Sequence, residues 1–334
     1  MTTPYAGSNI MGTSGLIAVD KVANHIRFYD PTSLREIKSF PAPEPAAHEL
    51  AISHDRRLAF VPLYGDGIYG ANRQPNNKVL VIDLAEKRLA DVIPLGDYTA
   101  PHGMVATSGG KLWVVCDIPN KLLLVDPARR AIEAAYDCPA KGAHLLAQLP
   151  DESKLYISSK EGDLAAFDPA ARVFTGRVPL RAPDVMSGNG SGSEGLMPTP
   201  DGGRLVVIDN IKNDLRVIDT KTDTEIDRVP LQMWALSNPK RSRLAKLMFS
   251  PDGAHLVVTC YAGGLAWVID AADLRQQVVV PVAKGPQGMA FPPDGASVLV
   301  ASHDSGLLTR VDLASKRAVA AYDGGAGIEV LAHY

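Results

Sequence analysis

The sequence predicts an all-β fold built from seven copies of one unit, and three observations support this prediction. First, residues 287–313 hold three short apolar runs separated by a Pro-Asp-Gly turn and a polar loop. Runs of this length between turn signals are typical of strands. Second, the unit recurs, and each copy closes on an aspartate: Asp30, Asp83, Asp126, Asp168, Asp219, Asp270 and Asp312. Third, these aspartates lie 42 to 53 residues apart, near the roughly 40–45-residue period of a four-stranded β-propeller blade.

Within each unit the elements follow one order. The first two strands and the turn between them are expected at 48–64, 102–117, 144–160, 194–210, 246–261 and 287–303. A third strand then ends at the closing aspartate. The unit at 15–30 lacks its own first strand, and residues 328–334 form a first strand with nothing after it. We therefore expect the C-terminal strand to complete the first blade and remove the exposed sheet edges. Residues 1–334 are expected to form a single seven-bladed β-propeller domain.

The repeat resembles the YVTN-type (surface-layer-like) seven-bladed propellers. The resemblance rests on an SPDG turn such as Ser250–Gly253, a following strand and a closing V-x-D such as Val268–Asp270. It covers nearly all of the chain. The Y-V-T/S-N end of the second strand is present only loosely, as YISS from Tyr156 and VVTC from Val257. The resemblance implies the fold but no particular activity, because such blades host unrelated functions.

Composition narrows the classes of function. The net charge of −3 and the pI near 6.2 argue against nucleic-acid or anionic-membrane partners. No apolar run approaches the ~18 residues of a membrane span. The start lacks the basic and apolar regions of a signal peptide, and the three cysteines show no C-x-x-C spacing. These features predict a cytoplasmic protein, or a periplasmic one if a leader has been removed. We expect a small-molecule substrate and a monomer or weak homo-oligomer.

Extra chain length is concentrated in three segments, at 64–77, 181–193 and 231–245. All three fall on the face where the inner strands of the predicted blades begin. Loops longer than about 12 residues in a compact domain are usually functional or disordered. We therefore expect a cap over the central funnel, in which Arg73 contacts a ligand from above.

The residues expected at the heads of the inner strands are mostly polar or ionisable: His48, His102, His144, Glu194, Lys246, Gln287 and Ile328, with Glu329 one step later. Three consecutive blades thus offer histidine and the next offers glutamate. Neutral imidazoles and a carboxylate suit Zn, Mn, Fe, Cu or Ni. His48, His102, His144 and Glu194 are therefore the predicted ligands of a divalent transition metal. A metal-free acid–base or anion-binding site and a merely solvated channel are the alternatives.

Further candidates follow from the same alignment. The predicted catalytic groups are Lys246, Glu329, His303 and Tyr261; the predicted substrate contacts are Gln287, Lys160, Tyr64 and Arg73. Lys246, Gln287 and Glu329 are expected on the wall opposite the metal, where they can hold a substrate or move protons. Lys160, Tyr64, Tyr261 and His303 come from the ends of second strands, which return to the same face.

These residues favour a metal-dependent enzyme at the mouth of the channel that acts on a small polar carbonyl or carboxylate metabolite. A hydrolase (lactonase-like) or a lyase is the first prediction. A metal-dependent oxidase or oxygenase, and a non-catalytic propeller that binds a ligand or a protein, are the alternatives. No G-x-S-x-G, H-E-x-x-H or Walker-type motif is present. The few, irregularly spaced tryptophans (Trp113, Trp234 and Trp267) argue against a quinone cofactor.

Overall fold

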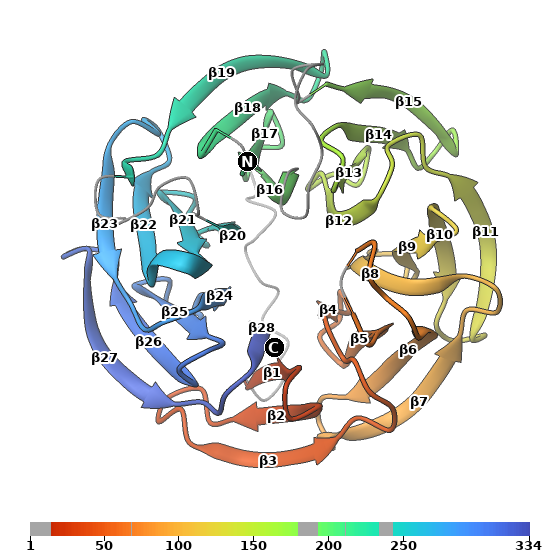
Figure 1. Ribbon diagram of the computed structural model, residues 1–334, viewed down its shortest axis with the longest axis horizontal. Helices are drawn as coiled ribbons and strands as arrows, with labels where there is room; N and C mark the ends of the chain where they lie inside the picture. The colour runs from red at the N-terminus through yellow and green to blue at the C-terminus, as the bar shows by residue number, and fades with distance from the viewer. Residues whose placement is uncertain (1–14, 68, 180–192, 211, 234–242) are drawn as a thin grey trace.

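The computed structural model describes residues 15–67, 69–179, 193–210, 212–233 and 243–334. These residues form seven four-stranded antiparallel sheets arranged as blades around a central axis (Figure 1). The predicted seven-bladed β-propeller is thereby confirmed.

Each blade runs from an inner strand near the axis to an outer strand at the rim. Blade 1 consists of β28 (Ile328–His333), β1 (Leu16–Asp20), β2 (His25–Tyr29) and β3 (Glu36–Pro41). Blade 2 consists of β4 (Ala51–Ile52), β5 (Leu58–Gly65), β6 (Pro75–Asp83) and β7 (Arg88–Pro94). Blade 3 consists of β8 (Thr99–Ala106), β9 (Leu112–Ile118), β10 (Lys121–Asp126) and β11 (Ala131–Asp137). Blade 4 consists of β12 (Ala143–Gln148), β13 (Leu155–Ser159), β14 (Leu164–Asp168) and β15 (Val173–Val178).

The remaining three blades follow the same order. Blade 5 consists of β16 (Ser193–Pro198), β17 (Arg204–Asp209), β18 (Asp214–Asp219) and β19 (Thr224–Pro230). Blade 6 consists of β20 (Leu244–Phe249), β21 (His255–Cys260), β22 (Leu265–Asp270) and β23 (Gln277–Pro281), with a 3-10 turn, η3 (Tyr261–Gly263), after β21. Blade 7 consists of β24 (Pro286–Ala290), β25 (Ser297–Ser302), β26 (Leu307–Asp312) and β27 (Arg317–Asp323).

The C-terminal strand closes the ring as the sequence predicts. β28 pairs antiparallel with β1 and becomes the inner strand of blade 1. The Gly15 and Tyr334 backbones exchange two hydrogen bonds, with N···O distances of 2.9 and 3.0 Å. Because β28 covers the inner edge of β1, that edge is not exposed where the two ends of the chain meet.

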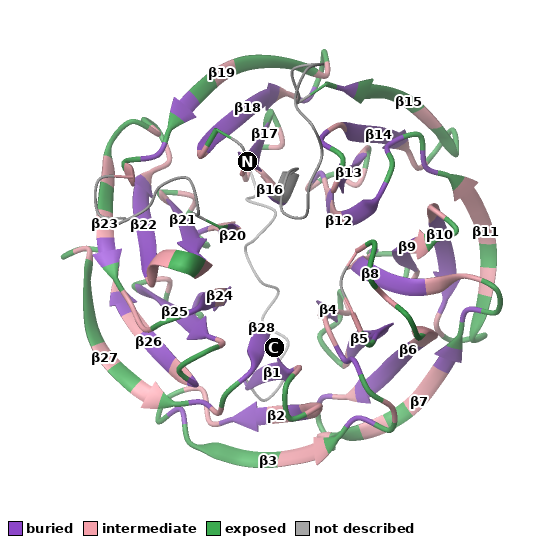
Figure 2. Cartoon of the chain, viewed as in Figure 1, coloured by how far each residue is buried: buried purple, intermediate pink, exposed green. Residues whose placement is uncertain are grey.

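The core lies between neighbouring blades. Middle strands are buried on both faces, whereas outer strands such as β3 and β27 are largely exposed (Figure 2). One cluster joins Val206 and Ile208 of blade 5 to Leu256 and Trp267 of blade 6. Each such fully buried apolar side chain contributes about 1.5–3 kcal/mol. All three cysteines are buried and free, as expected for reduced thiols.

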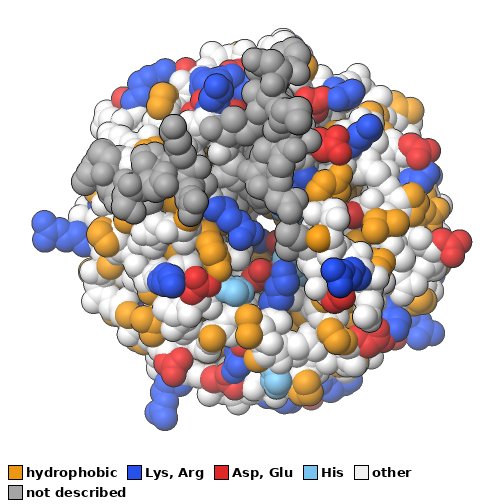
Figure 3. All heavy atoms as spheres, viewed as in Figure 1, with side chains coloured by type: hydrophobic (Ala, Val, Ile, Leu, Met, Phe, Trp, Pro, Cys, Tyr) orange, Lys and Arg blue, Asp and Glu red, His pale blue; other side chains and the backbone are white. Residues whose placement is uncertain are grey.

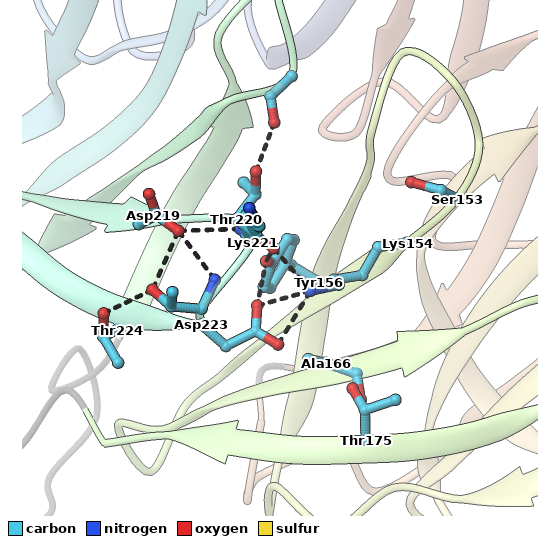
Figure 4. A network of polar contacts seen from close by, with 12 residues as sticks. Ser153, Lys154, Tyr156, Ala166, Thr175, Asp219, Thr220, Lys221, Asp223 and Thr224 are labelled. Atoms are coloured by element: carbon cyan, nitrogen blue, oxygen red, sulfur yellow. Dashed lines mark hydrogen bonds and ion pairs between the residues drawn. The ribbon is translucent and has the colours of Figure 1, made fainter.

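A network of polar contacts also joins blade 4 to blade 5 (Figure 4). Lys154 Nζ donates to the Thr220 carbonyl at 2.7 Å and to Asp223 Oδ1 at 2.9 Å. The Tyr156 hydroxyl donates to the same Asp223 carboxylate, and Thr220 Oγ1 donates to the Gly202 carbonyl at 2.6 Å. The contacts of Lys154 and Tyr156 hold the β18–β19 turn against the start of β13. The start of β13 lies at the face of the ring opposite to the inner-strand heads, because the head residue Ala143 pairs with Ser159 at the other end of this strand.

The predicted cap is described only in part. The segment at 64–77 leaves β5 and returns as β6, with Ile68 outside the described residues. Residues 180–192 and 234–242, which make up most of the other two long segments, also lie outside them. No helix in the described ranges is long and apolar enough to cross a membrane.

Candidate functional site

A β-bulge lies at the head of the inner strands and sets the direction of the head residues. In blade 3, Pro101 pairs with Cys116 and Met104 with Val114, so His102 and Gly103 together oppose one residue. The same one-residue excess occurs at His144–Leu145 in blade 4 and at Glu329 in blade 1. Blades 5, 6 and 7 show it at 194–195, 245–246 and 287–288. Bulges re-aim side chains next to functional sites, and here they occur at the predicted heads.

Three of the predicted histidines come together at these heads. His48 Nε2 and His102 Nε2 are 2.8 Å apart, and the rings of His102 and His144 are 4.0 Å apart between centroids. His102 and His144 are buried, with 3% and 8% exposure. His102 Nδ1 has no hydrogen-bond partner among the described residues. Imidazoles from blades 2, 3 and 4 therefore share one polar pocket, as the sequence alignment predicts.

A glutamate joins two of these histidines in a possible metal-binding set. Ligand atoms of His48, Glu49 and His102 all lie within 4.8 Å of one another. Two nitrogens bound tetrahedrally at ~2.0–2.1 Å lie about 3.3–3.4 Å apart, so the two Nε2 atoms, now 2.8 Å apart, would separate by about half an ångström around a zinc ion. Two imidazoles and a carboxylate are a donor set that first-row transition metals accept. The residues present therefore fit a metal ion.

Glu329 lies beside His48, not on an opposite wall. Its Oε2 accepts a hydrogen bond from His48 Nδ1–H, while Lys21 Nζ and Gln287 Nε2 lie 3.4 and 3.5 Å from its Oε1. This bond places the proton of His48 on Nδ1 and leaves the Nε2 lone pair facing the cluster. A carboxylate that holds the second ring nitrogen in this way orients a histidine ligand. The predicted placement of Glu329 across the channel is thus corrected, because its bulge turns it toward blade 2.

Burial favours the uncharged forms of two of the imidazoles, those of His102 and His144. Burial lowers the pKa of His102 well below its ordinary value, and the nearby His144 and His48 act in the same direction. Burial also lowers the pKa of His144, with Lys160 adding to the effect. Burial would raise the pKa of Glu329, but its interactions with His48, Lys21 and Lys246 outweigh this effect and hold the pKa below its ordinary value. A neutral imidazole, as burial favours at His102, and an ionised carboxylate are the forms in which these groups bind metals.

These groups line a cavity at the channel mouth with about 610 Å³ of empty space, part of it open to solvent. Eight of the residues singled out from the sequence line it: His48, His102, His144, Tyr64, Lys160, Lys246, Gln287 and Glu329. Acidic and basic side chains lie near one another around the centre of the face in Figure 3. Inner-strand heads therefore converge here with two of the four predicted second-strand ends, Tyr64 and Lys160.

Tyr64 forms a wall of the cavity with its ring. The ring lies 5.4 Å from that of His48 and 5.2 Å from that of His102 between centroids. Its hydroxyl donates to Asp117 Oδ2 at 2.5 Å. Burial raises the pKa of Asp117 to about 6, although the Tyr64 hydrogen bond acts in the opposite direction. Asp117 therefore anchors Tyr64 in contact with both histidines.

Three of the predicted site residues do not line this cavity, and the side chain of a fourth lies outside the described residues. Arg73 is exposed and does not line the cavity. Tyr261 and His303 do not line it either: both bond Asp304 Oδ1, at 2.5 and 3.1 Å. They form a separate group at the rim, where the Tyr261 ring also packs under Arg243. Glu194 belongs to β16, but its side chain lies outside the described residues.

Glu49 is not among the metal ligands predicted from the sequence. Strict strand alternation turns the residue after His48 away from the axis. In blade 2, however, regular pairing begins only at Ala51, after a single bridge between Ala47 and Leu63. His48 and Glu49 thus lie in irregular backbone, where both side chains reach the site. Lys21, Tyr69 and Arg243 also line the cavity.

We expect Glu329→Gln to weaken metal binding by about 10–100-fold, because the amide no longer supplies the charge that orients His48. The measurement is a competition titration with a chromophoric chelator. Asp323→Asn, at the exposed end of β27, is the control and should leave the affinity unchanged. Equal metal affinities of Glu329→Gln and the parent protein would show that Glu329 does not support the ligand.

The fold is similar to those of solved structures of distant sequence. Hydrazine synthase from Kuenenia stuttgartiensis matches with a TM-score of 0.70 and 15% identity, over 87% of this chain and 90% of that chain. A functionally unknown protein from Desulfotomaculum acetoxidans DSM 771 matches with a TM-score of 0.71 and 14% identity, over 94% and 98%. No family model and no curated protein matches the sequence. At this identity the likeness concerns the fold alone, and the YVTN type remains a resemblance.

Proposed function

We propose that this propeller is a metal-dependent enzyme whose site lies at the mouth of its central channel and acts on a small carboxylate- or carbonyl-bearing metabolite. One observation carries the proposal: His48, Glu49 and His102 offer ligand atoms within 4.8 Å of one another inside a cavity. His144 packs against His102 with its ring tilted by 44° and completes the imidazole cluster.

The residues around this cluster have separable roles. Glu329 holds the Nδ1 proton of His48, and Tyr64 packs against both His48 and His102. Lys246 and Lys160 line the same cavity and supply positive charge for an anionic substrate. A metal bound by the imidazoles and the carboxylate would polarise a carbonyl or activate water. Hydrolase (lactonase-like) or lyase chemistry is therefore the proposed reaction class.

A second candidate is metal-dependent oxidation. Two imidazoles and one carboxylate, with positions left open, are the donor set of non-haem iron(II) oxygenases. His48, His102 and Glu49 supply these three donors. Metal identity separates the two candidates: zinc favours the hydrolase or lyase, whereas iron or copper with substrate-dependent oxygen uptake favours the oxidation.

The first test is elemental analysis of protein purified without chelator. We expect about one first-row transition metal per chain, because ligand atoms of three residues already lie within 4.8 Å of one another. Loss of this metal to a chelator should abolish turnover of the lactones or carboxylates that the protein accepts, and added metal should restore it. Occupancy below ~0.2 per chain that added metal does not raise would reject the metal site. A loaded protein without turnover would support the non-catalytic alternative.

A further inference from the structure

An ion pair crosses the mouth of the ring directly beside the candidate metal site. Lys246, carried by β20 of blade 6, donates from Nζ to Glu49 Oε2 of blade 2 at 2.5 Å. The two blades lie on opposite sides of the axis (Figure 1). The side chains are only 20% and 13% exposed. Because a largely buried charge is costly without a partner, each of the two groups depends on the other or on a replacement.

Glu49 is also the carboxylate of the candidate metal cluster. Its carboxylate lies within 4.8 Å of the ligand nitrogens of His48 and His102. A bound divalent cation is the largest local charge in a site. A carboxylate that ligates such an ion has less negative charge left for an ammonium group. Metal binding at Glu49 therefore weakens the attraction that holds Lys246 across the channel.

The charges around the cavity make a second anion favourable. The described residues that line it include four cations, Lys21, Lys160, Arg243 and Lys246, and two carboxylates, Glu49 and Glu329, while Lys160 also acts on the buried Asp117 carboxylate. The Glu329 carboxylate is held by His48. Burial is the main cause that lowers the pKa of His144, and Lys160, Lys246 and Arg243 act in the same direction. A divalent metal would add to this positive charge in a partly enclosed space.

We propose that Lys246 is a metal-dependent anion contact: when a metal ion takes the Glu49 carboxylate, the Lys246 ammonium becomes the partner of a carboxylate group on the ligand. The ligand class is thus a small carboxylate anion that spans from the imidazole cluster to the Lys246 side of the cavity. This inference rests on the proposed function and extends it, because metal and ligand binding become thermodynamically coupled. Coupling of this kind is reciprocal, so the anion also tightens metal binding by the same factor.

The test is calorimetric titration of malonate into the full-length protein, first metal-free and then loaded with one equivalent of zinc and freed of excess metal. We expect malonate to bind the loaded protein about tenfold more tightly, a usual size for coupling between two sites. Malonamide, which has the same shape without charge, should show no such difference. Metal content measured after each titration establishes that malonate has not removed the zinc.

The variant Lys246→Met tests the assigned residue. We expect it to retain zinc but to lose the coupling, so that malonate binds the loaded and metal-free forms within about twofold of each other. Lys141→Met is the matched control, because Lys141 lines a separate depression of blade 4 with Arg177 and Glu161 and does not line this cavity. This control should keep the full coupling.

The outcomes separate the two proposals. If the parent protein binds no metal, the proposed function fails. If it binds zinc but malonate shows equal affinity with and without the metal, only the exchange at Lys246 is rejected. Full coupling in Lys246→Met would likewise reject it. Should Lys246→Met not fold, the comparison of loaded and metal-free parent protein still decides whether the coupling exists.

Discussion

The double change His48→Ala with His102→Ala is expected to abolish metal retention while the protein still unfolds cooperatively. The two Nε2 atoms lie 2.8 Å apart and belong to the three-residue ligand set. Changing a partner outside the ligand sphere already costs 10–100-fold in affinity, so loss of two ligands should cost at least ~100-fold. The measurements are metal content after desalting and thermal unfolding followed by circular dichroism.

His54→Ala is the matched control for this double change. His54 is exposed and lies in the turn at the far end of the same short strand, β4. Its removal should leave metal content unchanged. Metal retention in the double variant would show that His48 and His102 are not ligands. A collapsed fold would instead assign these imidazoles a structural role.

The change Gly103→Ala is expected to destabilise the ring and to disturb the site together. A Cβ at Gly103 would lie 2.7 Å from Leu145 Cα, 2.8 Å from the His144 carbonyl oxygen and 2.9 Å from Leu146 N. All three are backbone atoms of blade 4, which cannot rotate away. Overpacking of this kind costs about 1–3 kcal/mol. Because Gly103 follows His102 and contacts His144, the displacement should also lower metal occupancy.

Gly176→Ala provides the comparison. Gly176 lies in the outer strand β15, and no heavy atom lies within 4 Å of a Cβ placed there. Its substitution should change the free energy of unfolding by no more than about 0.5 kcal/mol, as for other open surface positions. Urea unfolding and metal content are measured for both variants. Equal stability of the two would mean that blades 3 and 4 separate without cost at this contact.

The sequence by itself determined the architecture. Repeated apolar runs, Pro-Asp-Gly turns and closing aspartates predicted seven blades, and the lone strand at 328–334 predicted the closure that β28 and β1 form. These features are local and each is repeated, so the pattern stays visible even where one copy departs from it in sequence. The repeat also placed His48, His102 and His144 at equivalent heads, which the folded ring brings together.

Only the tertiary structure determined which side chains of the site contact one another. The partnership of Glu329 with His48 and the span of Lys246 to Glu49 join residues separated by 281 and 197 positions. Bulges at the inner-strand heads and the late start of β4 set these directions. A strand's period of two cannot predict where one extra residue turns a side chain toward the axis. Side-chain partners across a closed ring depend on that turn and on the ring's curvature, which no single repeat encodes.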